Sequence, residues 1–167
     1  MVNRDVKKSD WKTEPMPAKH QQVACVKEYS PDEFNKIKSG VKPKVMEDKW
    51  FIYFEDNRLY FHRSWTGYCI YVVEFETCEN KNRISSITIN QDPEQSIETD
   101  TEWNVKFVLY LIDLFFLDKG CKFPRKNNTS GPKDAIFQWG LVGRELFKGH
   151  TLYSNKIRVV KKGENEK

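Results

Sequence analysis

The sequence lacks the patterns that identify several common classes of protein. Its first residues contain no apolar stretch of the kind that a secretory signal needs. The longest apolar run, residues 107–117, is interrupted by Asp113 and is shorter than the roughly 20 residues that span a bilayer. The four cysteines are scattered, with no C-x-x-C pair and no histidine at ligand spacing. We therefore expect a soluble, cytoplasmic protein with free thiols, no metal and no membrane partner.

Neither sign of charge is in large excess. The chain has 28 basic and 24 acidic residues and a net charge of +4, and residues of both signs are mixed along the sequence. A nucleic-acid partner is not expected, because dedicated nucleic-acid binders gather basic residues on one face. The sequence also lacks a glycine-rich phosphate loop and a complete nucleophile triad, so it identifies no cofactor and leaves open whether the protein is an enzyme.

Length and composition predict one folded domain. The 167 residues are 38% hydrophobic and 14% aromatic, which is enough to form a core. Residues 1–20 have no hydrophobic periodicity and predict a flexible tail outside the core. The domain is expected over residues 21–160, and residues 161–167 form a solvated end.

Strands are predicted most clearly between Trp50 and Phe75. Asp56 and Asn57 fit a two-residue hairpin turn, which would pair Phe54 with Leu59, Ile52 with Phe61, and Trp50 with Arg63. Apolar residues occupy both faces of this hairpin, so we place it in the middle of the sheet. Gly67 suits a left-handed position in the next tight turn, which predicts a third strand over residues 68–75. A fourth strand is predicted over residues 84–90.

Two capping boxes predict helix starts. Ser30 and Glu33 open a short helix that Gly40 ends, and Thr99 and Glu102 open an apolar helix over residues 103–117. Lys106 and Asp113 would form an exposed polar stripe on the second helix. A third helix is predicted over residues 133–147 and a last strand over 153–160. The predicted fold class is α+β, an antiparallel meander of about four to six strands packed against one long apolar helix, with two shorter helices.

The candidate site is the polar segment after the second predicted strand. It contains His62, Arg63, Ser64, Trp65 and Thr66. His62 and Ser64 share one side of the strand, whereas Arg63 faces the other side. His62 fits a general base, a ligand contact or a histidine satisfied within the sheet. Arg63 fits an ion pair or an anion contact, and Trp65 either stacks on a ligand, anchors a partner or folds back on the sheet.

The run WFIYFEDNRLYFHRSWTGYCIY, followed by the helix DTEWNVKFVLYLIDLFF, resembles a pattern in small uncharacterised bacterial proteins. The resemblance covers the middle of the chain and is specific at HRSWTG. It implies that this segment is one structural unit, and it implies no activity.

Three functional hypotheses follow from the segment. In the leading one, the protein binds a small anionic, nucleotide-like ligand through residues 62–67. In the alternative, it is a protein-interaction or inhibitor module that uses the aromatic hairpin and Trp65 as an anchor. In the third, it is a hydrolase or transferase that uses His62, which would need a carboxylate to orient the imidazole.

Overall fold

The computed structural model describes residues 5–96, 98–119, 122–124, 138 and 140–143. The helices and strands in this part are a 3₁₀ turn η1 (Lys8–Asp10), β1 (His20–Tyr29), α1 (Pro31–Lys38), β2 (Trp50–Glu55), β3 (Arg58–Arg63), β4 (Cys69–Cys78), β5 (Lys81–Asn90), α2 (Thr101–Ile112) and the π-helix η2 (Asp113–Leu117).

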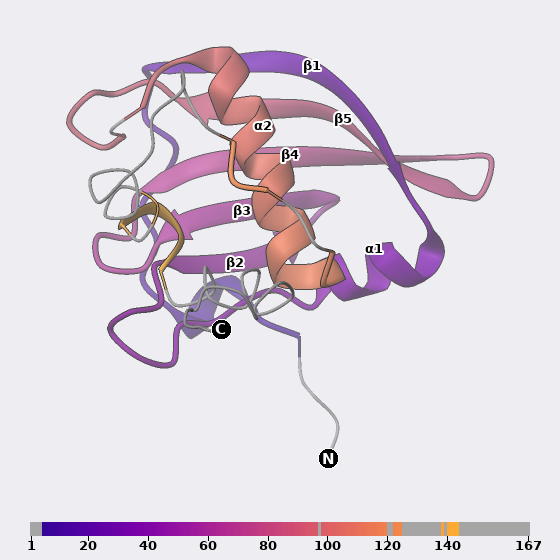
Figure 1. Cartoon of the computed structure of the whole chain (residues 1–167), viewed down its shortest axis with the longest axis horizontal. Helices are drawn as coiled ribbons and strands as arrows, with labels where there is room; N and C mark the ends of the chain where they lie inside the picture. Colours follow the sequence, from indigo (N-terminus) through magenta and orange to yellow (C-terminus); the bar gives the residue numbers. More distant parts are fainter. Residues whose placement is uncertain (1–4, 97, 120–121, 125–137, 139, 144–167) are drawn as a thin grey trace, which may run out of the picture.

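The five strands form one antiparallel sheet in the order β1-β5-β4-β3-β2. Strands β2 to β5 are a meander, and β1 pairs with the last strand of this meander. Helix α2 crosses one face of the sheet, and α1 lies at its end (Figure 1). The predicted α+β class with an antiparallel sheet is confirmed.

The hairpin register is the predicted one. Phe54 lies opposite Leu59, Ile52 opposite Phe61, and Trp50 opposite Arg63. The turn residues Asp56 and Asn57 have φ angles of 52° and 63°, as a tight turn compatible with the twist of the strands requires.

The position of this hairpin in the sheet differs from the prediction. Strand β2 is at the edge of the sheet and not in its middle. Part of its outer edge is covered by Val41, whose N–H and C=O both bond to Ile52 at 2.8 Å. Apolar residues on both faces of a strand show that both faces are covered, but they do not show how many strands lie on each side.

The first capping box is confirmed. Ser30 Oγ accepts a bond from Glu33 N at 3.1 Å, and Glu33 Oε1 accepts from Ser30 N at 3.0 Å. The second helix begins differently, because its N-cap is Asp100, which accepts from Trp103 N at 2.9 Å. A carboxylate is a stronger acceptor at this position than the hydroxyl of the predicted cap, Thr99.

The main core lies between the sheet and α2. The buried strand residues Trp50, Ile52, Leu59 and Phe61, with the partly buried Phe54, belong to one cluster with the buried α2 residues Phe107, Tyr110 and Leu111 and with Leu114 of η2. The ring centroids of Trp50 and Phe107 are 6.3 Å apart. This packing agrees with the predicted apolar face of the hairpin.

The N-terminal segment packs on the opposite face of the sheet, behind β2 and β3 in Figure 1. Trp11 Nε1 donates to Ser64 O at 2.8 Å, and Glu14 N donates to Gly67 O at 2.8 Å. The Trp11 ring lies 6.5 Å from the ring of Phe51. Residues 5–20 therefore pack on the second aromatic face of the hairpin, although none of them is buried or belongs to the core cluster.

Most of the predictions for the C-terminal part fall outside the described residues. They include the strand over 153–160, the end at 161–167 and Cys121. Of the helix predicted over 133–147, Gln138 and residues 140–142 are described and are helical. Within the described part, no helix has the length and apolar character needed to cross a bilayer.

Candidate functional site

The structure separates the five predicted site residues. His62 and Arg63 end strand β3, and Ser64, Trp65 and Thr66 form the turn that leads to Gly67. Gly67 has a φ of 82°, as predicted, and its N–H bonds to Arg63 O at 2.8 Å. Within this turn the side chains face different environments, so the segment does not form one polar cluster.

His62 is buried beneath the N-terminal segment. Its Nδ1 lies 2.9 Å from Gly67 O, and because a carbonyl only accepts, the proton is on Nδ1. Its Nε2 is buried and has no hydrogen-bond partner among the described residues. Burial lowers the pKa of His62, and the bond to Gly67 only partly opposes that shift. The imidazole is therefore neutral near pH 7 and is stacked on Tyr53, with ring centroids 5.6 Å apart.

Ser64 and Thr66 are held by backbone contacts. Ser64 is 2% exposed, and its Oγ donates to Asp48 O at 2.7 Å. No hydrogen bond joins Ser64 to His62 within the described part, so the two side chains do not form a nucleophile and base pair. Thr66 Oγ1 accepts from Tyr68 N at 3.2 Å and stabilises the turn.

Arg63 faces the α2 side of the sheet. Its Nη1 donates to Leu141 O at 3.0 Å, its Nη2 donates to Gly140 O at 2.6 Å, and its guanidinium carbon lies 4.7 Å from the centre of the Trp50 ring. Burial lowers the pKa of Arg63 to about 10, so the group is still a cation at neutral pH. Among the described carboxylates, none lies within ion-pair distance of it. Among the described residues, the partners of Arg63 are thus main-chain carbonyls and not a carboxylate.

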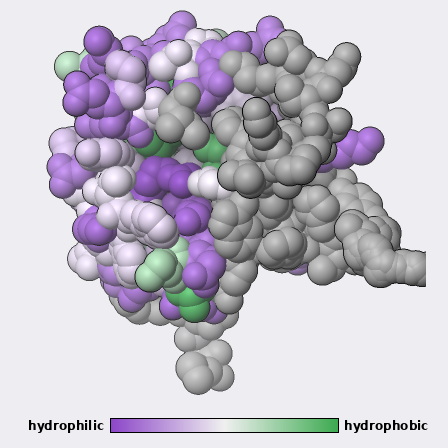
Figure 2. All heavy atoms as spheres, turned by 60° about the vertical axis from the view of Figure 1, so that its left-hand side comes forward, coloured by the Kyte–Doolittle hydropathy of each residue, from purple (hydrophilic) through white to green (hydrophobic). Residues whose placement is uncertain are grey.

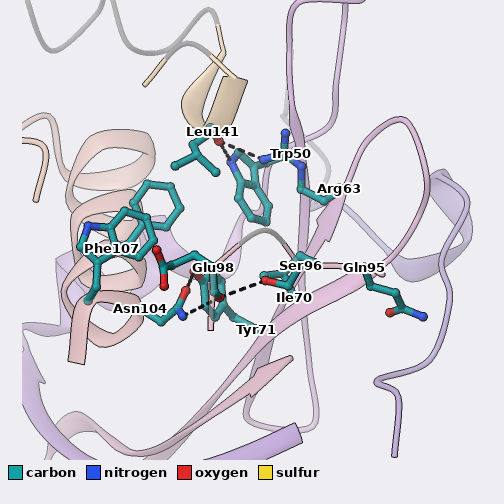
Figure 3. Close-up of a pocket in the computed structure, with 11 residues that line it drawn as sticks. Trp50, Arg63, Ile70, Tyr71, Gln95, Ser96, Glu98, Asn104, Phe107 and Leu141 are labelled. Atoms are coloured by element: carbon teal, nitrogen blue, oxygen red, sulfur yellow. Dashed lines mark hydrogen bonds between the residues drawn. The ribbon is translucent and has the colours of Figure 1, made fainter. Parts of the chain in front are cut away.

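Arg63 lines a cavity of about 90 Å³ between the sheet and α2 (Figure 3). Aromatic side chains form much of its wall, and they are Trp50, Tyr71, Trp103 and Phe107. Arg63 and Trp50 lie beside Leu141, whereas Asn104 projects from α2 toward Tyr71 and Glu98. The cavity therefore combines apolar walls with a cation on one side and amide and carboxylate groups on the other.

Asn104 fixes the polar side of this cavity. It is 1% exposed, its Oδ1 accepts a bond from Tyr71 Oη, and its Nδ2 donates to Glu98 O and Asp100 O, both at 2.9 Å. The sequence analysis missed Tyr71, Glu98 and Asn104. Asn104 did carry a signal, because it is an amide within a nearly continuous apolar stretch of the helix.

Trp65 lines a different hollow, on the outer surface. It is 58% exposed, its Nε1 donates to Met46 O at 2.9 Å, and Lys49 Nζ lies 4.0 Å from its ring centre. Trp65, Val45 and Met46 line a groove of about 600 Å³. The indole is therefore held at its nitrogen and still presents much of its surface to solvent.

Other reactive groups are not gathered into a site in the described part of the chain. No set of His, Cys, Asp or Glu there could hold a metal ion. Cys25, Cys69 and Cys78 are free thiols, and burial raises the pKa of Cys69 to about 12, which keeps it protonated.

Comparison with known proteins gives no further assignment. No family model matches the chain, and no curated protein or solved structure is significantly similar to it.

Proposed function

We propose that this protein binds a small anionic ligand in the cavity beside Arg63. The observation that carries the proposal is the environment of the guanidinium. Arg63 is a partly buried cation on an aromatic wall, and no described carboxylate neutralises it. A carboxylate or a similar oxyanion would supply the missing charge.

The contacts of Arg63 leave it able to bind an anion. Its bonds to Leu141 O and Gly140 O use two of the five N–H groups of the guanidinium. A neutral carbonyl compensates a buried charge less well than an anion, because burial removes the water that would otherwise stabilise the cation. The planar fork of the remaining donors suits a carboxylate.

The volume and charge of the cavity narrow the ligand class. A cavity needs a volume of at least about 10–15 Å³ to hold one water molecule. The cavity beside Arg63, at about 90 Å³, therefore suits a molecule no larger than a single ring. This is smaller than the nucleotide-like ligand expected from the sequence. Glu98 lines the same cavity and would repel a second negative charge. The proposed ligand is a monoanion with an apolar body that lies among the aromatic side chains.

Benzoate, benzamide and phthalate test this assignment, because they share a ring and differ in charge. Binding is measured by calorimetry and by amide chemical shifts on the full chain. We expect benzoate to bind more tightly than neutral benzamide and more tightly than the dianion phthalate. We expect Arg63→Lys to weaken benzoate about tenfold, because the ammonium keeps the charge and loses the fork.

Arg58→Lys is the matched control. Arg58 lies at the other end of β3, pairs with Glu74 at 2.8 Å and is remote from the cavity. Its substitution should leave benzoate affinity unchanged. The melting temperature of both variants is measured beside affinity, because Arg63 also holds the carbonyls of Gly140 and Leu141. Equal affinity for benzoate and benzamide, or no effect of Arg63→Lys on a folded protein, would contradict the proposal.

A further inference from the structure

Exposed apolar side chains gather at the Trp65 groove. Among the described residues, the large apolar side chains that are exposed are Val26, Val45, Met46 and Trp65. Three of these four line the same groove, and Val26 lies on the edge strand β1. In the view of Figure 2, small hydrophobic patches lie at the surface among hydrophilic side chains. A large aromatic residue with a methionine beside it is typical of the centre of a protein interface.

The backbone beneath these side chains is fixed. Asp48 Oδ2 accepts from Lys44 N at 2.9 Å and from Val45 N at 3.3 Å, and Asp48 N donates to Val45 O at 3.0 Å. Trp65 Nε1 holds the same loop through Met46 O. The apolar surface is therefore formed before any partner arrives, which reduces the entropy lost on binding.

A second hollow extends the groove along the N-terminal segment. It has a volume of about 680 Å³ and shares Trp11 with the first hollow. Four lysines line the two hollows, and they are Lys7, Lys8, Lys12 and Lys44. The acidic residues that line them are Asp48, which already accepts two backbone N–H groups, and Glu55. The two hollows, which meet at Trp11 and are here called the track, are lined by more basic than acidic residues and are apolar at the Trp65 end.

We propose that this track binds an acidic peptide segment of a partner protein. An apolar or aromatic side chain of the partner would contact Trp65, Val45 and Met46, and its Asp or Glu residues would lie along Lys12, Lys8 and Lys7. This interaction surface is separate from the Arg63 cavity, because the adjacent residues Arg63 and Ser64 line different hollows.

A peptide fits the groove better than single-stranded nucleic acid does. Nucleic-acid tracks present open aromatic faces on which successive bases stack. Here Lys49 Nζ already covers one face of Trp65, and the other exposed groove residues are the aliphatic Val45 and the thioether Met46. Aliphatic and thioether surfaces accept side chains of varied shape and offer no stacking plane.

Peptide selection on the full chain tests the proposal. Random displayed peptides are selected on the wild-type protein, with the Trp65→Ala protein as the counter-selection bait. We expect the enriched peptides to share one apolar or aromatic residue with Asp or Glu beside it. Synthetic copies should bind about tenfold or more weakly to Trp65→Ala, as for the central residue of an interface.

The lysines and the exposed valine give matched variants. Lys7→Gln with Lys8→Gln should weaken the same peptides about two- to fivefold, and higher salt should remove this difference. Val26→Ala and Arg63→Lys should leave peptide affinity unchanged, which separates a failure here from a failure at the Arg63 cavity. Met46→Ala is a second groove variant if Trp65→Ala does not fold.

Three results would overturn the inference. Enriched peptides without acidic residues would show that the lysines do not select the partner. Equal affinity for the wild-type protein and both groove variants would show that the groove is not the site. Binding of oligothymidylate that depends on Trp65, without any enriched peptide, would identify the occupant as nucleic acid.

Discussion

Single residues at the end of β3 have opposite roles although they are adjacent in sequence. Arg63 points to the α2 side, where Leu141 O accepts bonds both from its Nη1 and from Trp50 Nε1, the latter at 2.6 Å. Ser64 points to the other side and holds the loop at Asp48. The alternation of side chains along a strand therefore divides one polar motif between two hollows.

The backbone conformation of Gly67 predicts the cost of a side chain at this position. Its φ of 82° is costly for a residue with a Cβ, and that Cβ would lie 3.3 Å from Lys12 O. We expect Gly67→Val to lower the free energy of unfolding by about 1–3 kcal/mol, measured by urea denaturation.

Gly140→Ala is the control for that measurement. Gly140 is helical, and no atom of the described residues, its own helix backbone and chain neighbours aside, lies within 4 Å of the position its Cβ would take. Alanine there should leave stability unchanged or raise it by up to about 1 kcal/mol. A Gly67→Val protein as stable as wild type would show that the turn adopts another backbone conformation.

Among the elements, helix α2 is followed at Asp113 by a different hydrogen-bond pattern. Helix α2 ends at Ile112, and residues Asp113–Leu117 continue as a π-helix. Asp113 was expected on an exposed stripe, but its Oδ1 is buried and has no hydrogen-bond partner among the described residues. Burial raises the pKa of this carboxyl, although Lys27 and Lys119 oppose the shift.

The raised pKa of Asp113 makes its charge unfavourable to folding. When folding raises the pKa of an acid, the protein becomes less stable as the pH rises from the pKa of the unfolded chain through the pKa of the folded state. We expect Asp113→Asn to stabilise the protein by about 0.5 kcal/mol near pH 7, a small gain because water screens a half-buried charge. This gain should shrink near pH 4 in urea denaturation.

Glu102→Gln is the control on the same helix, because Glu102 is exposed and pairs with Lys106 at 3.5 Å. Its loss near the N-terminus should cost a few tenths of a kcal/mol. If Asp113→Asn is destabilising near pH 7 and this loss shrinks near pH 4, the charged carboxylate contributes favourably through the lysines.

At the scale of the whole molecule, the sheet is covered on both faces by segments far apart in sequence. Helix α2 covers one face, and the N-terminal segment with Trp11 covers part of the other. Beneath that segment, burial depresses the pKa of His62, with a further contribution from Lys8. Packing of the N-terminal segment on the sheet therefore contributes to the way the protein's stability depends on pH.

Trp11→Ala tests this link. We expect a loss of about 2–3 kcal/mol, because the substitution removes a partly buried indole and its bond to Ser64 O. Below the ordinary pKa of 6.5 for histidine, His62 takes up a proton in the unfolded chain but not when it is buried in the folded protein. The free energy of unfolding therefore decreases as the pH is lowered below 6.5. That fall should be smaller in Trp11→Ala, where water can reach His62.

Trp65→Ala is the matched control, because Trp65 is 58% exposed. This substitution should lower the free energy of unfolding by about 1 kcal/mol or less. Urea denaturation over a series of pH values gives both quantities. Equal losses for the two tryptophans, with an unchanged pH profile, would mean that the N-terminal segment does not cover the sheet.

Local sequence determined the elements of this protein that depend on neighbouring residues. The Asp56-Asn57 turn, the register from Trp50 opposite Arg63 to Phe54 opposite Leu59, the Ser30 capping box and the left-handed Gly67 all follow from short-range sterics and hydrogen bonding. Alternation also predicted that Arg63 and Ser64 face opposite sides, because side chains along a strand alternate regardless of what surrounds it.

Tertiary structure alone decided what each of those faces meets. The place of β2 at the sheet edge depends on pairing that is remote in sequence, as do the contact of Trp11 with Phe51 and the bond from Arg63 to Leu141 O. The same is true of the cavity that Arg63 and Asn104 both line. Burial and charge compensation depend on these long-range contacts, and the sequence pattern records only that a side chain needs a partner. For that reason the sequence indicated only the segment of residues 62–67, whereas the cavity and the groove that its side chains line emerged only from the fold.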